Sequence, residues 1–299
     1  MAPYVFSIVI PTYNRPERLA SCLLSLTRLS YPRDRFEVIV VDDGSAQSMA
    51  PTVEPFESAL TLTLLRQVNS GPAQARNAGA ARAQGQYLVF TDDDCQPHPH
   101  WLNAIATELE QQPQALVGGH TLNALPSNVF STASQLLIDY LYDYYNSRRQ
   151  PSFFASNNFA LASEQFRQLG GFDTTFPLAA GEDREFCDRW LQHGLPMAYA
   201  PEARVDHSHH LSLRRFWRQH FNYGRGAYCF HQARARRAAE QVKVEPLRFY
   251  WQLLTYPLAR QFQVRGMVLS GLLFVSQVAN VTGFFWERNQ QKVPPVTPC

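Results

Sequence analysis

The chain has 299 residues, 45% of them hydrophobic and 17% charged, a composition that supplies a buried core and excludes a disordered chain. Residues 1–203 carry 13 Lys and Arg against 21 Asp and Glu, a net charge of −8, whereas residues 204–299 carry 14 against 4, a net charge of +10. We therefore expect one large α/β domain with an appendage, in which the acidic part suits a cation and the basic part suits phosphates or an anionic membrane surface.

The first apolar run, Tyr4 to Ile10, has no basic residue before it and is followed at once by Pro11. It is too short for a signal peptide, so we interpret it as a first buried strand. The cysteines are odd in number, scattered and without a Cys-X-X-Cys pair, which predicts neither a disulfide framework nor a thiolate zinc site and fits a reducing compartment. They are Cys22, Cys95, Cys187, Cys229 and Cys299.

Residues 1–115 alternate short apolar runs with helical stretches, a pattern that predicts a mostly parallel sheet flanked by helices. Helices are expected to start after Asn14-Arg15-Pro16, after Gly71-Pro72 and after Pro97 to Trp101. In such a sheet ligands bind beyond the carboxyl ends of the strands, where the polar clusters of this chain are found. The predicted strands are Val5 to Ile10, Phe36 to Val41, Leu60 to Leu65 and Gln86 to Phe90.

Beyond residue 115 the pattern is less regular, and we assign residues 116–235 to the acceptor-binding and catalytic half of the domain. Residues 236–299 are expected to form a helical, membrane-associated segment. The elements predicted here are strands at Leu116 to His120 and Asn158 to Ala162, an aromatic stretch at Leu136 to Tyr145, a helix from Glu182 and a basic amphipathic segment from Leu211 to Arg237.

Three carboxylates, Asp92, Asp93 and Asp94, follow the apolar run that ends at Phe90. Their mutual repulsion requires a compensating cation, and hard oxygen ligands favour Mg²⁺ or Mn²⁺ bridging to a diphosphate. A solvated acidic turn or helix cap is the alternative interpretation.

Several motifs follow one another along about three quarters of the chain: Ser7 to Arg15, Val40 to Ser45, Gly71 to Gly79, Phe90 to Asp94, Gly170 to Asp173, Gly181 to Asp183 and His207 to Gly226. In this order they resemble the motifs of the family 2 glycosyltransferases. The resemblance implies a GT-A fold, a nucleotide-sugar donor and inversion of the transferred sugar.

The resemblance implies a donor nucleotide site built on the first two motifs. Tyr13 would stack on the base, and Asp43 or its neighbour Asp42 would accept a hydrogen bond from it, which favours uracil or another base with a ring N–H. Pro11 belongs to the same site. The alternative is that Tyr13 packs and Asp42 caps a turn.

The same resemblance extends the donor site to Arg76, near the phosphates or ribose, and to Asp92 and Asp93, with Asp92 facing the ribose. Asp94, the last Asp of the Asp-X-Asp motif, would ligate the Mn²⁺ or Mg²⁺. For Arg76 a surface salt bridge is an equal alternative.

Family resemblance assigns the catalytic base to Asp183, which would take the proton of the acceptor hydroxyl as it attacks in line with the departing diphosphate. Glu182, Asn158 and His209 would contact the acceptor or support these groups. His207 would ligate the metal or contact the diphosphate; for Asp183 the alternative is a carboxylate that stabilises a helix N-terminus.

The 21 residues from Gly266 to Trp286 contain no charge and are long enough to span a bilayer. They also contain three glycines and several polar side chains, so a helix that lies on the membrane is an equal expectation, and a core or dimer-interface helix is the alternative. We expect an enzyme anchored or peripheral at the cytoplasmic face of a membrane.

The sequence thus predicts a metal-assisted glycosyltransferase acting on a saccharide or lipid-linked acceptor in polysaccharide, lipopolysaccharide or glycolipid biosynthesis. Two alternatives remain. A sugar nucleotidyltransferase should carry a Gly-rich basic loop after the first strand, where this chain has Pro11 to Asn14. A non-catalytic membrane-attached assembly factor would need neither acidic cluster. Nucleic-acid binding is disfavoured by the net negative charge of residues 1–203 and by the apolar segment from Gly266 to Trp286.

Overall fold

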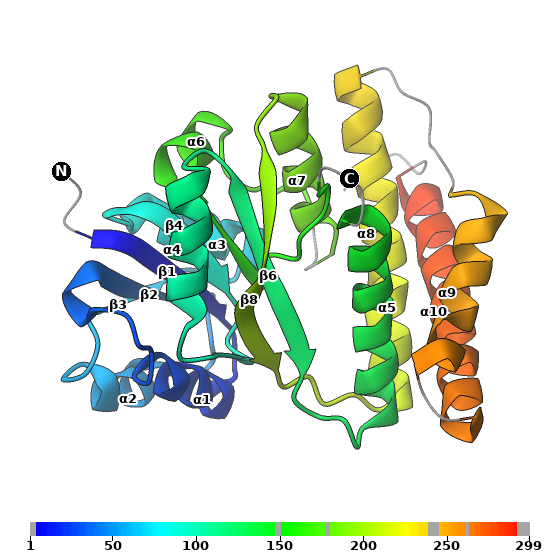
Figure 1. The fold of residues 1–299 in the computed structure, drawn as a ribbon, viewed down its shortest axis with the longest axis horizontal. Coiled ribbons are helices and arrows are strands. Elements are labelled where there is room, and N and C mark those ends of the chain that lie inside the picture. Colours follow the sequence, from blue (N-terminus) through cyan, green and yellow to red (C-terminus); the bar gives the residue numbers. More distant parts are fainter. Residues whose placement is uncertain (1–3, 147–150, 177–179, 239–244, 261–262, 292–299) are drawn as a thin grey trace, which may run out of the picture.

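The computed structural model describes residues 4–146, 151–176, 180–238, 245–260 and 263–291. Within them, eight strands form one sheet in the order β3-β2-β1-β4-β7-β6-β8-β5, which Figure 1 shows crossing the molecule. The first four strands pair in parallel and β7 runs antiparallel to β4, so the mostly parallel sheet is confirmed. The strands are β1 Tyr4–Thr12, β2 Phe36–Asp42, β3 Leu62–Arg66, β4 Gly85–Thr91, β5 Cys95–Pro97, β6 Leu116–Asn123, β7 Asn158–Ala162 and β8 Met197–His207.

Ten α-helices lie in the described part of the chain, together with two 3₁₀ turns at Arg33–Arg35 and Glu54–Phe56. Most strands and helices agree with the sequence patterns to within a few residues, whereas β5, α2 and α6 are too short to have been predicted. The helices are α1 Pro16–Leu26, α2 Ala50–Val53, α3 Pro72–Arg82, α4 Trp101–Gln111, α5 Val129–Asn146, α6 Ser163–Gln168, α7 Glu182–Gln192, α8 Leu213–Ala238, α9 Leu247–Arg260 and α10 Gln263–Gln290.

Two hydrophobic clusters cover the two faces of the sheet. On one face α1 and α4 contribute side chains such as Leu23 and Trp101, and on the other α6 and α7 contribute Phe166 and Trp190. Strands β1, β2 and β4 are buried along nearly their whole length, as expected for a parallel sheet covered on both sides. The sheet therefore holds its carboxyl edge, where the loops after β1, β2 and β4 meet, in fixed geometry.

Helices α5, α8, α9 and α10 form a third layer beside the sheet, the C-terminal helix layer. In it α5 and α8 lie nearer to the sheet and α9 and α10 lie on the outside (Figure 1). Helices α8 and α10 approach closely at two glycines: a Cβ on Gly224 would lie 1.8 Å from the carbonyl oxygen of Asn280, and one on Gly283 would lie 1.9 Å from that of Phe221. Only residues without a side chain allow these backbones to touch. The layer is therefore packed along α8, which also contacts α5 and α7.

The four described cysteines are free, and three of them, Cys22, Cys95 and Cys187, are buried. Cys299 lies outside the described residues. The sheet continues across residue 115, so the division of the domain into halves at that point stays a prediction about function.

Candidate active site

A pocket of about 1130 Å³ lies between the carboxyl edge of the sheet and the C-terminal helix layer. Four acidic residues of the two predicted clusters, Asp92, Asp94, Glu182 and Asp183, line it, whereas Asp93 does not. The two acidic clusters therefore share one site. Arg76, His207 and His209 also line the pocket.

The carboxylates after β4 are held by arginines at the start of α1. Arg15 Nη1 lies 3.0 Å from Asp93 Oδ1 and 3.4 Å from Asp94 Oδ2, and Arg18 Nη1 lies 2.8 Å from the same Asp94 oxygen. Asp93 also accepts a hydrogen bond from Thr12, and burial raises its pKa to about 6. The loop is thus a buried, partly neutralised cluster, and the alternative of a solvated acidic turn is wrong.

Three side chains could hold a metal ion: potential ligand atoms of Asp94, His207 and His209 all lie within 4.8 Å of one another. His207 Nε2 is 3.3 Å from Asp94 Oδ1. Burial alone would raise the pKa of Asp94, but His207 and Arg15 outweigh it and hold that pKa below its usual range. Burial and His207 lower the pKa of His209 to about 4, so His209 is neutral near pH 7 and available as a ligand. One carboxylate and two imidazoles fit Mn²⁺ or Mg²⁺ only with further oxygen ligands, such as those of a diphosphate.

His207 and His209 lie side by side although only His207 belongs to a strand. Strand β8 ends at His207, so His209 lies in the following loop and not on the same strand face. The two rings nevertheless contact each other, with centroids 5.1 Å apart. The carbonyl of His209 accepts a hydrogen bond from Ser131 Oγ of α5, which helps to fix the loop.

Arg76 joins the two acidic clusters. Its guanidinium is buried, with Nη2 2.7 Å from Asp92 Oδ1 and Nη1 3.1 Å from Glu182 Oε1. The surface salt bridge considered from the sequence is therefore wrong, because the arginine lies inside the site. It sets the distance between the loop after β4 and the start of α7.

Helix α7 begins with Glu182 and Asp183, directly after Gly181, which has a left-handed φ of 90°. A Cβ on Gly181 would lie 2.9 Å from the carbonyl oxygen of Gly226 in α8, so the turn needs glycine for both conformation and space. Burial raises the pKa of both carboxyl groups, and the neighbouring Asp183 raises the pKa of Glu182 further. Asp183 Oδ1 accepts the Arg184 N–H at 2.7 Å, while Glu182 Oε2 is buried without a hydrogen-bond partner among the described residues.

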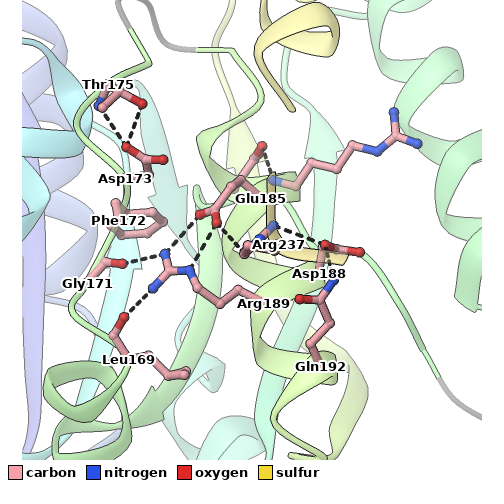
Figure 2. Close-up of polar contacts among 12 residues, drawn as sticks. Leu169, Gly171, Phe172, Asp173, Thr175, Glu185, Asp188, Arg189, Gln192 and Arg237 are labelled. Atoms are coloured by element: carbon pink, nitrogen blue, oxygen red, sulfur yellow. Dashed lines mark hydrogen bonds and ion pairs between the residues drawn. The ribbon is translucent and has the colours of Figure 1, made fainter. Parts of the chain in front are cut away.

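A network of polar contacts around Glu185, Asp188 and Arg189 fixes helix α7, as Figure 2 shows. Arg189 donates to the carbonyls of Leu169 and Gly171 and to both oxygens of Glu185. Arg237, near the end of α8, reaches the same Glu185 at 2.7 Å and Asp188 at 3.1 Å. Helix α7 is thereby tied to the loop after α6 and to α8, so Asp183 is carried by a rigid element.

The residues predicted for base recognition lie beside the pocket, at the ends of β1 and β2. Tyr13 is 48% exposed, so its ring is free to stack. Asp43 is committed to structure, because its oxygens accept hydrogen bonds from Gln67 and from the backbone N–H groups of Ser70 and Gly71. Asp42 is buried, accepts the Ser45 N–H through Oδ1, and has its Oδ2 buried 3.7 Å from Arg66 Nε without a hydrogen bond. Of the two aspartates, only Asp42 therefore keeps an oxygen without a hydrogen bond among the described residues, and that oxygen lies beside the Arg66 guanidinium.

Pro11 is the last but one residue of β1 and is half-buried, adjacent to these groups. Asn158 has a different position from the one expected. Asn158 is fully buried. Its side-chain oxygen accepts a hydrogen bond from Trp101 Nε1 at 2.8 Å, and its side-chain nitrogen donates one to the Ala203 carbonyl at 2.9 Å. The pocket is lined instead by the preceding residues, Ser156 and Asn157.

Sequence reasoning missed Arg15 and Arg18 as partners of the acidic loop. The signal was available, because Pro16 marks the first turn of α1 and places both arginines at the helix start, over the carboxyl edge of the sheet. It also missed the apolar side of the pocket. That side is formed by residues of α5, α9 and α10, among them Leu137, Leu141, Phe249, Leu253, Val281, Phe284 and Phe285.

Comparisons with known proteins find two matching family models and several relatives. The family model described as glycosyl transferase family 2 matches residues 7–169, more than half of the chain, and the one described as the N-terminal domain of galactosyltransferase matches residues 140–212. The chain is 28% identical over 207 residues to glycosyltransferase AglE of Haloferax volcanii, covering 67% of this chain and 66% of that one. Across this and the next two curated relatives, the chain spans 23 to 66% of the relative's length.

Two solved structures share the fold. A mannosyltransferase from Pyrobaculum calidifontis, in complex with GDP-Man and Mn²⁺, superposes with a TM-score of 0.64 at 19% identity, over 93% of this chain and 87% of that one. Residues 1–349 of TarS from S. aureus, in complex with UDP-GlcNAc, give a TM-score of 0.55 at 17% identity, over 96% and 91% of the two chains.

Proposed function

The chain belongs to glycosyl transferase family 2, and from this premise we propose that it transfers a sugar from a UDP- or GDP-sugar to a hydroxyl acceptor with inversion at the anomeric carbon. It is a glycosyltransferase with a GT-A fold. One observation carries the proposal: the Asp92 to Asp94 loop and the Glu182-Asp183 pair face a single pocket and are joined by Arg76.

Asp183 is the proposed base. The acceptor O–H gives its proton to the Asp183 carboxylate while its oxygen forms a bond to the anomeric carbon and the bond from that carbon to the diphosphate breaks. Attack opposite to the leaving group inverts the carbon. Burial raises the pKa of Asp183, which makes it a stronger base than an exposed carboxylate. Arg76, paired with Glu182 beside it, opposes the rise in the pKa of this second carboxylate that burial causes.

The proposed metal site consists of Asp94, His207 and His209, whose ligand atoms lie close enough together to share one ion. A bound Mn²⁺ or Mg²⁺ would neutralise the charge of the departing diphosphate. The protein's own cations lie on the same side: Arg15 and Arg18 contact Asp94 and sit where they can also contact phosphate oxygens. Asp92 and Asp93 complete this side of the donor site.

For the nucleotide, we propose that the exposed ring of Tyr13 stacks on the base and that Asp42 accepts its ring N–H, with Pro11 lining the site. Uracil and guanine both carry such an N–H. The solved structures of similar fold contain GDP-Man with Mn²⁺ in one case and UDP-GlcNAc in the other, which supports a donor of this class.

We propose a saccharide or lipid-linked acceptor, used in polysaccharide, lipopolysaccharide or glycolipid biosynthesis at the cytoplasmic face of a membrane. The apolar side of the pocket suits an acceptor that carries a hydrophobic group next to its hydroxyl. Helix α10 is long and apolar enough to contact a membrane.

A donor screen tests the enzymatic proposal. Each UDP- and GDP-sugar is incubated with the protein and Mn²⁺, and free nucleoside diphosphate is measured with and without a chelator. We expect Asp183→Asn to lower turnover by about 10² to 10⁴, the usual contribution of a general base, with the KM for the donor unchanged. Asp34→Asn, at an exposed aspartate in the 3₁₀ turn Arg33–Arg35 outside the pocket lining, is the control.

The screen also separates the alternatives. An assembly factor would release no diphosphate from any donor, and a nucleotidyltransferase would release pyrophosphate from a nucleoside triphosphate. Inversion is read from the anomeric proton coupling of the product by NMR, and retention of configuration would refute the in-line mechanism.

A further inference from the structure

Helix α10 carries an exposed stripe that is apolar, although solvent-facing positions of a helix are normally polar. Val264, Val268, Phe274, Val281 and Phe285 are between 49% and 71% exposed. The stripe also contains Met267, Gly271, Val278 and Trp286, all exposed, at the three- and four-residue spacing of one helix face. The opposite face, which packs on α8, contains Ser276 and Glu287.

Positive charge and tryptophan frame this stripe. Arg265 and Arg288 stand at its two ends, both exposed, and no charged residue lies from Gly266 to Trp286. Trp286 is 42% exposed at one end, and Trp251 of the neighbouring helix α9 is 71% exposed. Tryptophan and arginine around an apolar band are the arrangement that suits the boundary between lipid tails and anionic head groups.

The apolar stripe borders the pocket. Val281 and Phe285 belong to both, because each lines the pocket and is about half exposed. The pocket therefore reaches the protein surface at the stripe. A protein partner seated there would close it, whereas a fluid bilayer would leave it open to lipid.

Helix α10 cannot cross a bilayer while it keeps this packing. It contacts α8 along its length, and α8 carries arginines such as Arg225, which pairs with Glu287 of α10 at 2.7 Å. These charges would have to enter the hydrocarbon core, which strongly disfavours charged side chains. Only the exposed apolar stripe of α10 is available to contact lipid, and a helix that is apolar on one side fits a membrane interface.

We propose that the α10 stripe, with Trp251 of α9, lies in the interface of a bilayer containing anionic lipids, and that the pocket opens into this interface to receive an acceptor hydroxyl carried by a lipid. The acceptor part rests on the proposed function. The docking part does not, because it depends on the exposed side chains alone.

Vesicle flotation tests the docking. The full chain is mixed with vesicles of phosphatidylcholine and phosphatidylglycerol, and the variant Met267→Asp/Phe274→Asp is compared with it, since neither residue lines the pocket. We expect vesicle affinity to fall about 100-fold, because each lost apolar contact weakens binding by about a factor of ten. The control is Leu24→Asp/Val68→Asp, which adds the same charge at exposed apolar positions in the sheet half and should bind as the wild type does.

A second measurement uses the wild type and so does not depend on the folding of a variant. Trp251 and Trp286 are exposed, whereas Trp101 and Trp190 are fully buried. Vesicles with doxyl-labelled lipid should quench tryptophan emission, and Trp286→Phe should reduce the quenching if the pocket mouth faces lipid.

Each outcome of these experiments supports or overturns the docking proposal. Wild-type affinity of Met267→Asp/Phe274→Asp for the vesicles would overturn the proposal, as would a wild-type protein that neither floats nor is quenched. A dimer that this variant dissociates, without vesicle binding by either form, would assign the stripe to self-association. If no nucleotide-sugar is turned over while vesicle binding and quenching persist, the proposed function fails and the docking stands.

Discussion

The bridge made by Arg76 can be tested by removing its charge. In Arg76→Met the side chain keeps most of its volume, but Asp92 Oδ1 and Glu182 Oε1 lose contacts of 2.7 and 3.1 Å. Each contact supplies about 5 kcal/mol of gross attraction at an effective dielectric of about 20. Desolvation of the three groups offsets most of this, so we expect a net destabilisation of about 3 to 5 kcal/mol, as for other buried pairs that lose one partner.

The loss should depend on pH in a defined direction. Burial raises the pKa of Glu182 in the folded protein, and Arg76 opposes that rise. Removing Arg76 raises this pKa further, so the folded variant takes up a proton that the unfolded chain releases. Its stability is retained at low pH, below the ordinary pKa of glutamate, and is lost as pH rises through the raised value. The destabilisation should therefore be largest near pH 8 and should shrink towards pH 5.

Urea denaturation followed by circular dichroism at these two pH values measures the free energy of unfolding. Arg82→Met is the matched control, because Arg82 is an exposed arginine on the same helix α3 and should change stability by less than about 0.5 kcal/mol. The double variant Arg76→Met/Glu182→Gln should recover part of the loss, since it removes the unpaired carboxylate. A loss below 1 kcal/mol in Arg76→Met at about pH 8, or a loss equal at both pH values, would refute the bridge.

Three further outcomes are expected. Because burial raises the pKa of Asp183 and the base must be ionised, kcat/KM should fall as pH drops through a value above that of an exposed aspartate, and this acid limb should vanish in Asp183→Asn. Tyr13→Ala should raise the KM for the donor about tenfold with kcat unchanged, from the loss of base stacking worth about 1 to 3 kcal/mol, whereas Tyr13→Phe should keep it; equal effects of the two would exclude stacking. Gly224→Ala should destabilise the protein by about 1 to 3 kcal/mol, because its Cβ meets the Asn280 carbonyl, whereas Gly271→Ala, in open space on α10, should be neutral or stabilising in thermal unfolding.

Sequence alone determined the parts of this protein that depend on local pattern. The alternation of buried strands and helices predicts the parallel sheet, because each strand must bury both faces and each helix one. The same reasoning places the ends of β1, β2 and β4 at one edge, so Thr12, Asp42 and Thr91 lead directly into the polar loops. The family motifs supplied the identity of the candidate residues.

The tertiary structure decided everything that depends on contacts between distant segments. Arg76 and Glu182 are 106 positions apart, and no periodicity relates them. Asp43 and Asp42 are neighbours of the same type, yet only the loop at residues 67–71 shows that Asp43 has hydrogen bonds on both carboxylate oxygens. In the same way, the apolar segment after residue 265 is compatible with a core helix, a spanning helix or an interfacial one. Its packing on α8 leaves one apolar face exposed, because burial is a property of neighbours that local composition does not specify.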